Sequence, residues 1–140
     1  MYTAVRGFSG EVGEAMRLFI EFFVDDVERS IRFYRDVIGM EQVRSSPEYN
    51  EFHLGEAEIS ICPFDDLRDG HYLREVPNDR LGNRVEFCLQ VSNLEEVYER
   101  VKKLGVAIRD PLQKRPWGAT DFRIIDPNGA YLRITSPVDL

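Results

Sequence analysis

Few side chains in this 140-residue chain combine the residue types and the spacing of a catalytic or metal site. His53 lies in a strand-like run and His71 in a polar segment, so the chain has neither the HxH nor the HExxH pattern typical of zinc sites. Cys62 and Cys88 form no CxxC pair, and both lie in strand-like runs, which favours free thiols in a reducing compartment. The sequence also lacks a GxSxG motif and a glycine-rich phosphate loop. Nucleophile, zinc and phosphate-loop chemistry of the usual kinds is therefore not indicated.

The elements that would position a site occur twice. Val24-Asp25-Asp26-Val27-Glu28 runs into an amphipathic segment that ends at Gly39. Val91-Ser92-Asn93-Leu94-Glu95, which begins 67 residues later, runs into a second such segment that ends at Gly105. An alternating apolar run precedes each acidic or amide residue, and further strand-like runs follow each glycine. A repeat of this length in a short chain predicts two copies of one βαβββ unit, with the function in what they enclose.

The ranges of the expected elements follow from the apolar periodicity. The first copy is predicted to contain strands over 18–24, 40–44, 49–54 and 58–62 and a helix over 27–38. The second is predicted to contain strands over 85–91, 106–108, 122–125 and 131–135 and a helix over 94–104. Asp25 or Asp26 and Asn93 are the predicted helix N-caps, and Glu96 would complete a capping box. Residues 111–117 are predicted to form a loop that ends in the one tryptophan.

Length and composition predict a single domain and limit its partners. The expected organisation is an N-terminal arm over 1–16, a first module over 17–62, a linker over 63–83 and a second module over 84–136. The net charge of −7 argues against a nucleic-acid partner and, unless it serves solubility alone, favours a cationic ligand. No stretch approaches the roughly 20 apolar residues that cross a membrane, and no signal peptide is recognisable. A cytoplasmic protein without a membrane partner is therefore predicted.

Several segments together resemble a known family. They are Val24-Asp25-Asp26-Val27-Glu28-Arg29-Ser30, Phe33-Tyr34, Ile38-Gly39-Met40, Pro116-Trp117-Gly118 and Asp126-Pro127-Asn128-Gly129. With the repeat, they resemble the vicinal oxygen chelate superfamily of glyoxalases, extradiol dioxygenases, fosfomycin-resistance transferases and bleomycin-resistance binding proteins. The resemblance covers about residues 17–136. It implies an α+β fold in which two tandem βαβββ modules form a curled sheet around a cavity, often within a dimer.

The resemblance also implies where a metal would be bound. Enzymes of the superfamily hold a divalent metal through His and Glu at four strand positions, which here are Phe19, Ser60, Glu86 and Arg133. Phenylalanine cannot ligate a metal, serine rarely does, and arginine places a positive charge where the cation would be. The usual metal site is therefore expected to be missing, with no metal and no cofactor. A register shifted by two residues leaves open an unusual site in which Glu21, His53 and Glu58 join Glu86.

Alternation along the strands predicts the cavity lining. The apolar residues at 18, 20, 22, 24, 85, 87, 89, 91, 132 and 134 are expected to face the helices, which turns their neighbours toward the cavity, together with Glu58 and Thr135. The predicted ligand-binding residues are Phe19, Glu21, Phe23, Ser60, Glu86, Cys88, Gln90, Trp117, Tyr131 and Arg133. Glu86 and Arg133 are expected to pair, either as a structural ion pair or as polar anchors for a ligand. Trp117, Phe19 and Phe23 are expected to form an aromatic wall.

The function that these patterns favour is binding rather than catalysis. We expect a small-molecule-binding protein of the bleomycin-resistance type, similar to antibiotic-resistance proteins, which holds an aromatic or cationic ligand in the inter-module cavity of a homodimer. Two alternatives stay open. One is a metal-dependent glyoxalase-like lyase or isomerase, or a dioxygenase, with atypical ligands. The other is a metal-free enzyme that uses Glu86 as its base.

Overall fold

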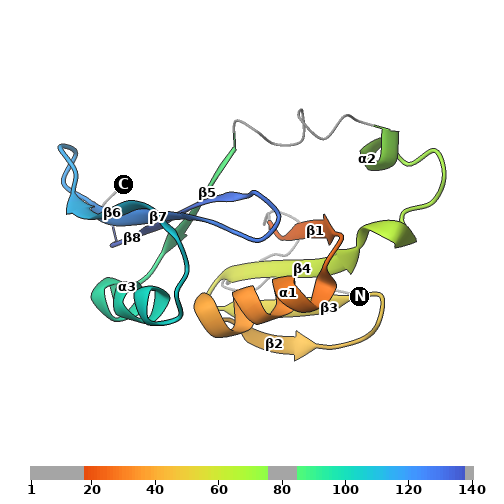
Figure 1. The fold of residues 1–140 in the computed structure, drawn as a ribbon, viewed down its shortest axis with the longest axis horizontal. Coiled ribbons are helices and arrows are strands. Elements are labelled where there is room, and N and C mark those ends of the chain that lie inside the picture. Colours follow the sequence, from red (N-terminus) through yellow and green to blue (C-terminus); the bar gives the residue numbers. More distant parts are fainter. Residues whose placement is uncertain (1–17, 76–84, 138–140) are drawn as a thin grey trace, which may run out of the picture.

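Two four-stranded sheets, each with one long helical segment, make up the protein (Figure 1). A computed structural model describes residues 18–75 and 85–137. The first sheet has the order β1-β4-β3-β2, with β1 (Ile20–Val24), β2 (Glu41–Arg44), β3 (Asn50–Leu54) and β4 (Ala57–Pro63). The second has the order β5-β8-β7-β6, with β5 (Glu86–Gln90), β6 (Ile108–Lys114), β7 (Thr120–Ile125) and β8 (Tyr131–Thr135).

The two modules have the same topology. In each, the first strand pairs in parallel with the last, and the remaining pairs are antiparallel. The first helix, α1 (Val27–Arg32), continues as a π-helical turn over Phe33–Val37, and the second, α3, spans Leu94–Lys103. The predicted α+β fold of two βαβββ modules is confirmed. Between the modules lie a 3₁₀ turn over Phe64–Asp66 and the short helix α2 (Tyr72–Glu75). No helix among the described residues is long and apolar enough to cross a membrane.

The two helices begin differently from one another. Asp26 is the N-cap of α1, where its Oδ1 accepts a hydrogen bond from the backbone N–H of Arg29 at 3.0 Å. Asn93 occupies the same position in α3, but its side chain makes no hydrogen bond to the helix backbone. Its Nδ2 donates to Glu96 Oε2 at 3.3 Å instead. The predicted capping box is therefore wrong in detail, because the two side chains bond to each other rather than to backbone N–H groups.

The largest difference from the predicted elements is at β6. A short strand over 106–108 followed by a loop over 111–117 was expected from the position of Pro111. The strand instead runs from Ile108 to Lys114 through this proline. This is possible because β6 is an edge strand, so a proline is tolerated there. Pro111 also lies where the register with β7 shifts, between Asp110 and Gln113, so the N–H group that proline lacks is not needed for pairing.

The alternation of the strands buries the apolar face as predicted. Val24, Leu132 and Ile134 lie in the core, and Ile20, Phe22, Phe87, Leu89 and Val91 are partly buried against it. Leu18 and Val85 are exceptions, since both are exposed just before their strands begin. Glu86, Cys88 and Gln90 lie on the opposite face of β5 and are exposed.

The modules meet through their helical sides. Tyr34, from the helical segment of the first module, donates a 2.6 Å hydrogen bond to Asp126 in the turn between β7 and β8 of the second. From α3, Arg100 donates through Nε to the carbonyl of Val37 at 3.1 Å and through Nη2 to that of Ile38 at 3.0 Å. Figure 1 shows α1 and α3 next to each other on the same side of the two sheets. Arg100 thus satisfies carbonyl groups that the end of the first helical segment leaves without partners.

Gly39 and Gly105 end equivalent helices, and they provide a matched test of this contact. Both have positive φ angles, +87° and +75°, but an added Cβ would lie 2.9 Å from Arg100 Nη2 at Gly39 and would meet nothing within 4 Å at Gly105. Both Gly39→Ala and Gly105→Ala should lose about 1–2 kcal/mol through backbone strain. Gly39→Ala should lose about 1 kcal/mol more, because Arg100 must release its carbonyl partners. Urea unfolding of the two variants measures the difference, and equal losses would contradict a structural role for the Arg100 contact.

Candidate functional site

An apolar cavity lies at the junction of the two modules. Its volume is about 610 Å³, within the range of small-molecule sites. The apolar lining includes Ile20, Phe22, Tyr34, Met40, Phe87, Leu89 and Leu132. Its polar members include three acidic residues, Glu56, Glu58 and Glu86. The carboxylates of Glu58 and Glu86 lie next to His53 and Arg133, respectively. An aromatic body suits the apolar wall, and the acidic residues in the lining favour a positive charge over a negative one.

Three aromatic rings form one wall of this cavity. The rings of Phe22 and Phe87 meet edge to face with centroids 5.5 Å apart, and Phe22 stacks on Tyr34 at 5.8 Å. These are the preferred arrangements of aromatic pairs. The wall is therefore built from both modules, Phe87 on β5 and the other two rings on the first module.

Tyr34 connects the cavity wall to the module interface. Its side chain is buried, and its hydroxyl donates to Asp126 Oδ2. Burial, the charge of Asp126 and this hydrogen bond together raise the pKa of Tyr34 well above its ordinary value of 10.0. The phenol is therefore held in its neutral form throughout the physiological range.

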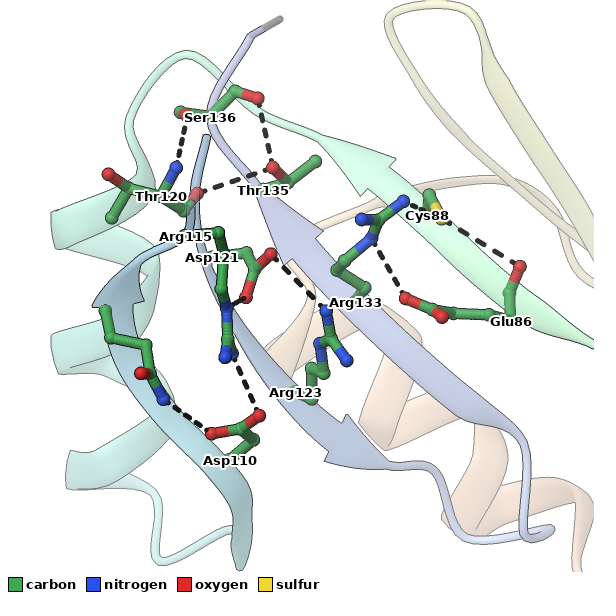
Figure 2. Close-up of polar contacts among 11 residues, drawn as sticks. Glu86, Cys88, Asp110, Arg115, Thr120, Asp121, Arg123, Arg133, Thr135 and Ser136 are labelled. Carbon is green, nitrogen blue, oxygen red and sulfur yellow. Dashed lines mark hydrogen bonds and ion pairs between the residues drawn. The ribbon is translucent and has the colours of Figure 1, made fainter. Parts of the chain in front are cut away.

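A polar network covers the other face of β5 and β8 (Figure 2). Arg133 Nε lies 2.9 Å from Glu86 Oε1, and Arg133 Nη2 lies 2.9 Å from the sulfur of Cys88. The predicted pairing of Glu86 with Arg133 is present in the structure. The pair is partly accessible to solvent, so each group keeps some hydration while the other compensates its charge.

The network continues across β7 to the edge strand (Figure 2). Arg115 bridges Asp110 at 2.9 Å and Asp121 at 2.8 Å, and Asp121 also lies 3.6 Å from Arg123. Arg123 is directly opposite Arg133 in the strand register, an arrangement of like charges that is unfavourable alone. The fully buried Asp121 offsets this repulsion, since its carboxylate lies between two guanidinium groups.

A smaller network occupies the corresponding face of the first sheet. Ser60 Oγ donates to the hydroxyl of Tyr49 at 2.8 Å, and that hydroxyl donates to Glu21 Oε2 at 3.1 Å. Glu21 and Ser60 are directly opposite each other on β1 and β4. Tyr49 was not among the predicted site residues. Tyr49 lies directly before β3 and two residues before Glu51, and this alternation is the signal that would have found it.

The ten predicted ligand-binding residues do not converge on one site within a single chain. Glu86 and Cys88 line the 610 Å³ cavity, and the other eight are not among its described lining residues. Phe23 packs near His71 with ring centroids 6.2 Å apart, and Tyr131 and Gln90 lie on β8 and β5. Trp117 is exposed at the tip of the β6–β7 hairpin, which Figure 1 places far from β1. The aromatic wall of Trp117 with Phe19 and Phe23 is therefore not formed within one chain.

The four positions implied for a metal do not suit one. Phe19 offers no donor atom, and the hydroxyl of Ser60 is hydrogen-bonded to Tyr49. Glu86 supplies a carboxylate, but its partner is the guanidinium of Arg133, a fixed cation where a metal ion would have to be. The donor set therefore does not fit the metal of the superfamily's enzymes.

The sequence pattern predicted that the residues of the aromatic wall belong to the core, not to a ligand-binding site. Phe22 and Phe87 lie on the apolar face of their strands, and Tyr34 lies on the apolar stripe of its helix. Nothing in the periodicity distinguishes an apolar residue that fills the core from one that lines a cavity. Their role depends on how the two modules pack.

Comparisons with known proteins agree with this fold. Residues 18–134 match the model of the Glyoxalase/Bleomycin resistance protein/Dioxygenase superfamily. Among solved structures, TioX from Micromonospora sp. ML1 is 18% identical with a TM-score of 0.69, and the match covers 89% of this chain and 100% of that one. Lactoylglutathione lyase from Agrobacterium tumefaciens is 20% identical with a TM-score of 0.66, covering 88% and 93%. A glyoxalase/bleomycin resistance protein/dioxygenase from Nocardioides is 18% identical with a TM-score of 0.70, covering 93% and 92%. At these identities the likeness concerns the fold alone, and a search of curated proteins finds no match.

The raised pKa of Tyr34 predicts how stability responds to alkaline pH. Below pH 10 both folded and unfolded Tyr34 are protonated, whereas above it the unfolded phenol ionises first, so its contribution falls by about 1.4 kcal/mol per pH unit. Tyr34→Phe should remove this slope. At neutral pH it should cost about 1–3 kcal/mol, because Asp126 Oδ2 loses its buried donor. Denaturant unfolding of both proteins between pH 7 and 11 checks this, and parallel pH profiles would contradict it.

Proposed function

Since the chain belongs to the glyoxalase/bleomycin resistance protein/dioxygenase superfamily, we propose that it is a small-molecule-binding protein of the bleomycin-resistance type. The ligand is aromatic or cationic and occupies the cavity between the modules. One observation carries this proposal, the 610 Å³ apolar cavity with an aromatic wall and acidic residues in its lining. The net charge of −7 also favours a cationic ligand, because it attracts cations. The two free cysteines support the proposed cytoplasmic location, where thiols stay reduced.

Binding is preferred to catalysis for a chemical reason. The four positions at which the enzymes of the superfamily hold their metal carry Phe19, Ser60, Glu86 and Arg133, whose side chains do not form a metal site. A metal-free enzyme with Glu86 as its base would need a carboxylate free to accept a proton, and that carboxylate is paired with Arg133. A metal-dependent lyase, isomerase or dioxygenase with atypical ligands is the second candidate. It is favoured by a histidine between two glutamates on the first sheet.

The proposal includes a homodimer. The polar face of β5 is open in one chain, since Glu86, Cys88 and Gln90 are exposed. That face of the second sheet carries Arg123 and Arg133, and the corresponding face of the first sheet carries Glu21 and Glu51. Pairing the first sheet of one copy with the second sheet of another would bring complementary charges together and shield both.

Ligand binding is tested with aromatic amines and their neutral isosteres in a thermal-shift screen. A ligand at 100 times its Kd should add about 2.7 kcal/mol of stability. Phe87→Leu keeps an apolar side chain but removes a ring of the wall, so it should weaken an aromatic ligand by about 0.5–1.5 kcal/mol, or two- to tenfold in Kd. Tyr72→Leu, on exposed α2, is the matched control and should have no effect.

A second pair of variants tests the charge preference. Glu86→Gln should weaken cationic ligands about tenfold and neutral isosteres far less, because it leaves the positive charge of Arg133 without its partner beside the cavity. Glu95→Gln makes the same change in net charge on the exposed surface of α3 and should leave both affinities unchanged. A panel without any stabilising compound, or a bound ligand indifferent to Phe87→Leu and Glu86→Gln, would refute the proposed cavity site.

The dimer is tested by mass and by thiol access. Light scattering at micromolar concentration should give about twice the 16.3 kDa of one chain. The exposed thiol of Cys88 should react slowly with a thiol reagent in the dimer and faster on dilution below the dissociation constant. Cys62 serves as an internal reference, since burial raises its pKa to about 11 and keeps it unreactive. A monomeric mass, or Cys88 labelling that does not depend on concentration, would contradict the dimer.

A further inference from the structure

Glu51, His53 and Glu58 form a compact group on the polar face of the first sheet, separate from the aromatic wall of the cavity and from the Arg133 network. Glu51 and His53 are two residues apart on β3 and share one face, and Glu58 on β4 is directly opposite His53 in the antiparallel register. We propose that these three side chains bind a first-row divalent transition-metal ion, at a site that borders the proposed ligand cavity through Glu58 but does not need a bound ligand to form.

The distances suit one ion. His53 Nε2 lies 2.6 Å from Glu51 Oε2 and 3.2 Å from Glu58 Oε1, and the ligand atoms of all three lie within 4.8 Å of one another. Bonds from such metals to imidazole nitrogen and carboxylate oxygen are about 2.0–2.2 Å, so two ligands of one ion are at most about 4.4 Å apart. Small side-chain rotations on a rigid pair of strands are enough to form the site.

His53 Nε2 cannot donate a hydrogen bond to both glutamates at once. Nε2 carries at most one hydrogen, and two carboxylates face it. The other ring nitrogen, Nδ1, is buried and has no hydrogen-bond partner among the described residues, so the polar contacts of His53 described by the structure converge on the two glutamates. A divalent cation would accept Nε2 and both carboxylates as ligands and would neutralise both negative charges.

Burial gives the site one open side. The side chains of Glu58 and His53 are 4% and 11% exposed, whereas that of Glu51 is 24% exposed, so within one chain the open side of the group is at Glu51. Glu58 also borders the 610 Å³ cavity. Three protein ligands leave further coordination positions for water or for an oxygen atom of a bound molecule.

The donor types select the metal. One imidazole and two carboxylates suit Zn²⁺, Mn²⁺, Fe²⁺ or Co²⁺, whereas Ca²⁺ and Mg²⁺ prefer oxygen ligands alone. The site differs from the positions implied for the superfamily's enzymes. Glu51 is opposite Ser60 in the register, so the group is displaced along the sheet toward β3 and uses none of those four residues.

The test is metal titration of chelator-treated, full-length protein without a polyhistidine tag. Co²⁺ should bind with a stoichiometry of one per chain, with visible absorption bands that report an imidazole and oxygen ligand set, and Zn²⁺ should compete for it. His53→Gln and Glu58→Gln should each weaken Co²⁺ binding at least tenfold. The matched controls His71→Gln and Glu48→Gln change the other histidine and an exposed glutamate and should bind as the wild type does.

Stability separates a metal site from a structural ion pair. Zn²⁺ should raise the melting temperature of the wild type and of both controls but not of the two site variants. Glu51→Gln, at the most exposed position, is the variant to use if His53→Gln or Glu58→Gln does not fold, and it should also lose tenfold in affinity. No stoichiometric binding by the wild type, or binding that His53→Gln and Glu58→Gln leave within threefold, would overturn the proposal. The contacts of His53 would then be an ion pair of the sheet.

Discussion

The hydrogen bond from Tyr34 to Asp126 determines how the two halves of the protein fit together. Asp126 is buried, and three donors satisfy its carboxylate, the Tyr34 hydroxyl and the backbone N–H groups of Asn128 and Ala130. The same side chain therefore shapes the β7–β8 turn of one module and anchors the helix of the other. Because an unpaired carboxylate at this depth is costly, the modules have little freedom to slide. The cavity depends on this, since the ring of Tyr34 also forms part of its wall.

Each sheet has an apolar face and a charged face. The helical side carries the apolar residues that form the core and leave a cavity where the modules join. The other side carries charged groups, several of which compensate one another, as Asp121 does for Arg115 and Arg123. If one member of such a group is removed, or if a strand shifts its register, the remaining charges are left without their partners. These networks therefore favour the observed strand registers.

Local patterns in the sequence predicted the repeat, the strand alternation and the Asp26 cap, because all three depend on residues close together in the chain. The pairing of Glu86 with Arg133 also followed, since parallel first and last strands bring them together. The packing of modules did not follow. Phe22 and Phe87 are 65 residues apart, and only the interface held by Tyr34 makes them a wall of one cavity rather than parts of two cores. The loop predicted from Pro111 was wrong because a proline interrupts a strand only where its missing N–H is needed for pairing. β6 is an edge strand, so it continues through Pro111.

Glu58 links the two proposed sites and makes the preference of the cavity conditional. Without an ion, Glu58 and the neighbouring Glu56 are acidic residues at the border of the cavity, and their negative charge favours a positively charged ligand. With a divalent ion on Glu51, His53 and Glu58, this charge is neutralised and an electrophilic centre lies at the border of the cavity. A ligand with an oxygen donor would then gain from direct contact with the metal, whereas a cation would be repelled by it. The same chain would therefore select ligands of opposite character in its metal-free and metal-bound forms, through one glutamate whose position is set by the two-residue turn after Leu54.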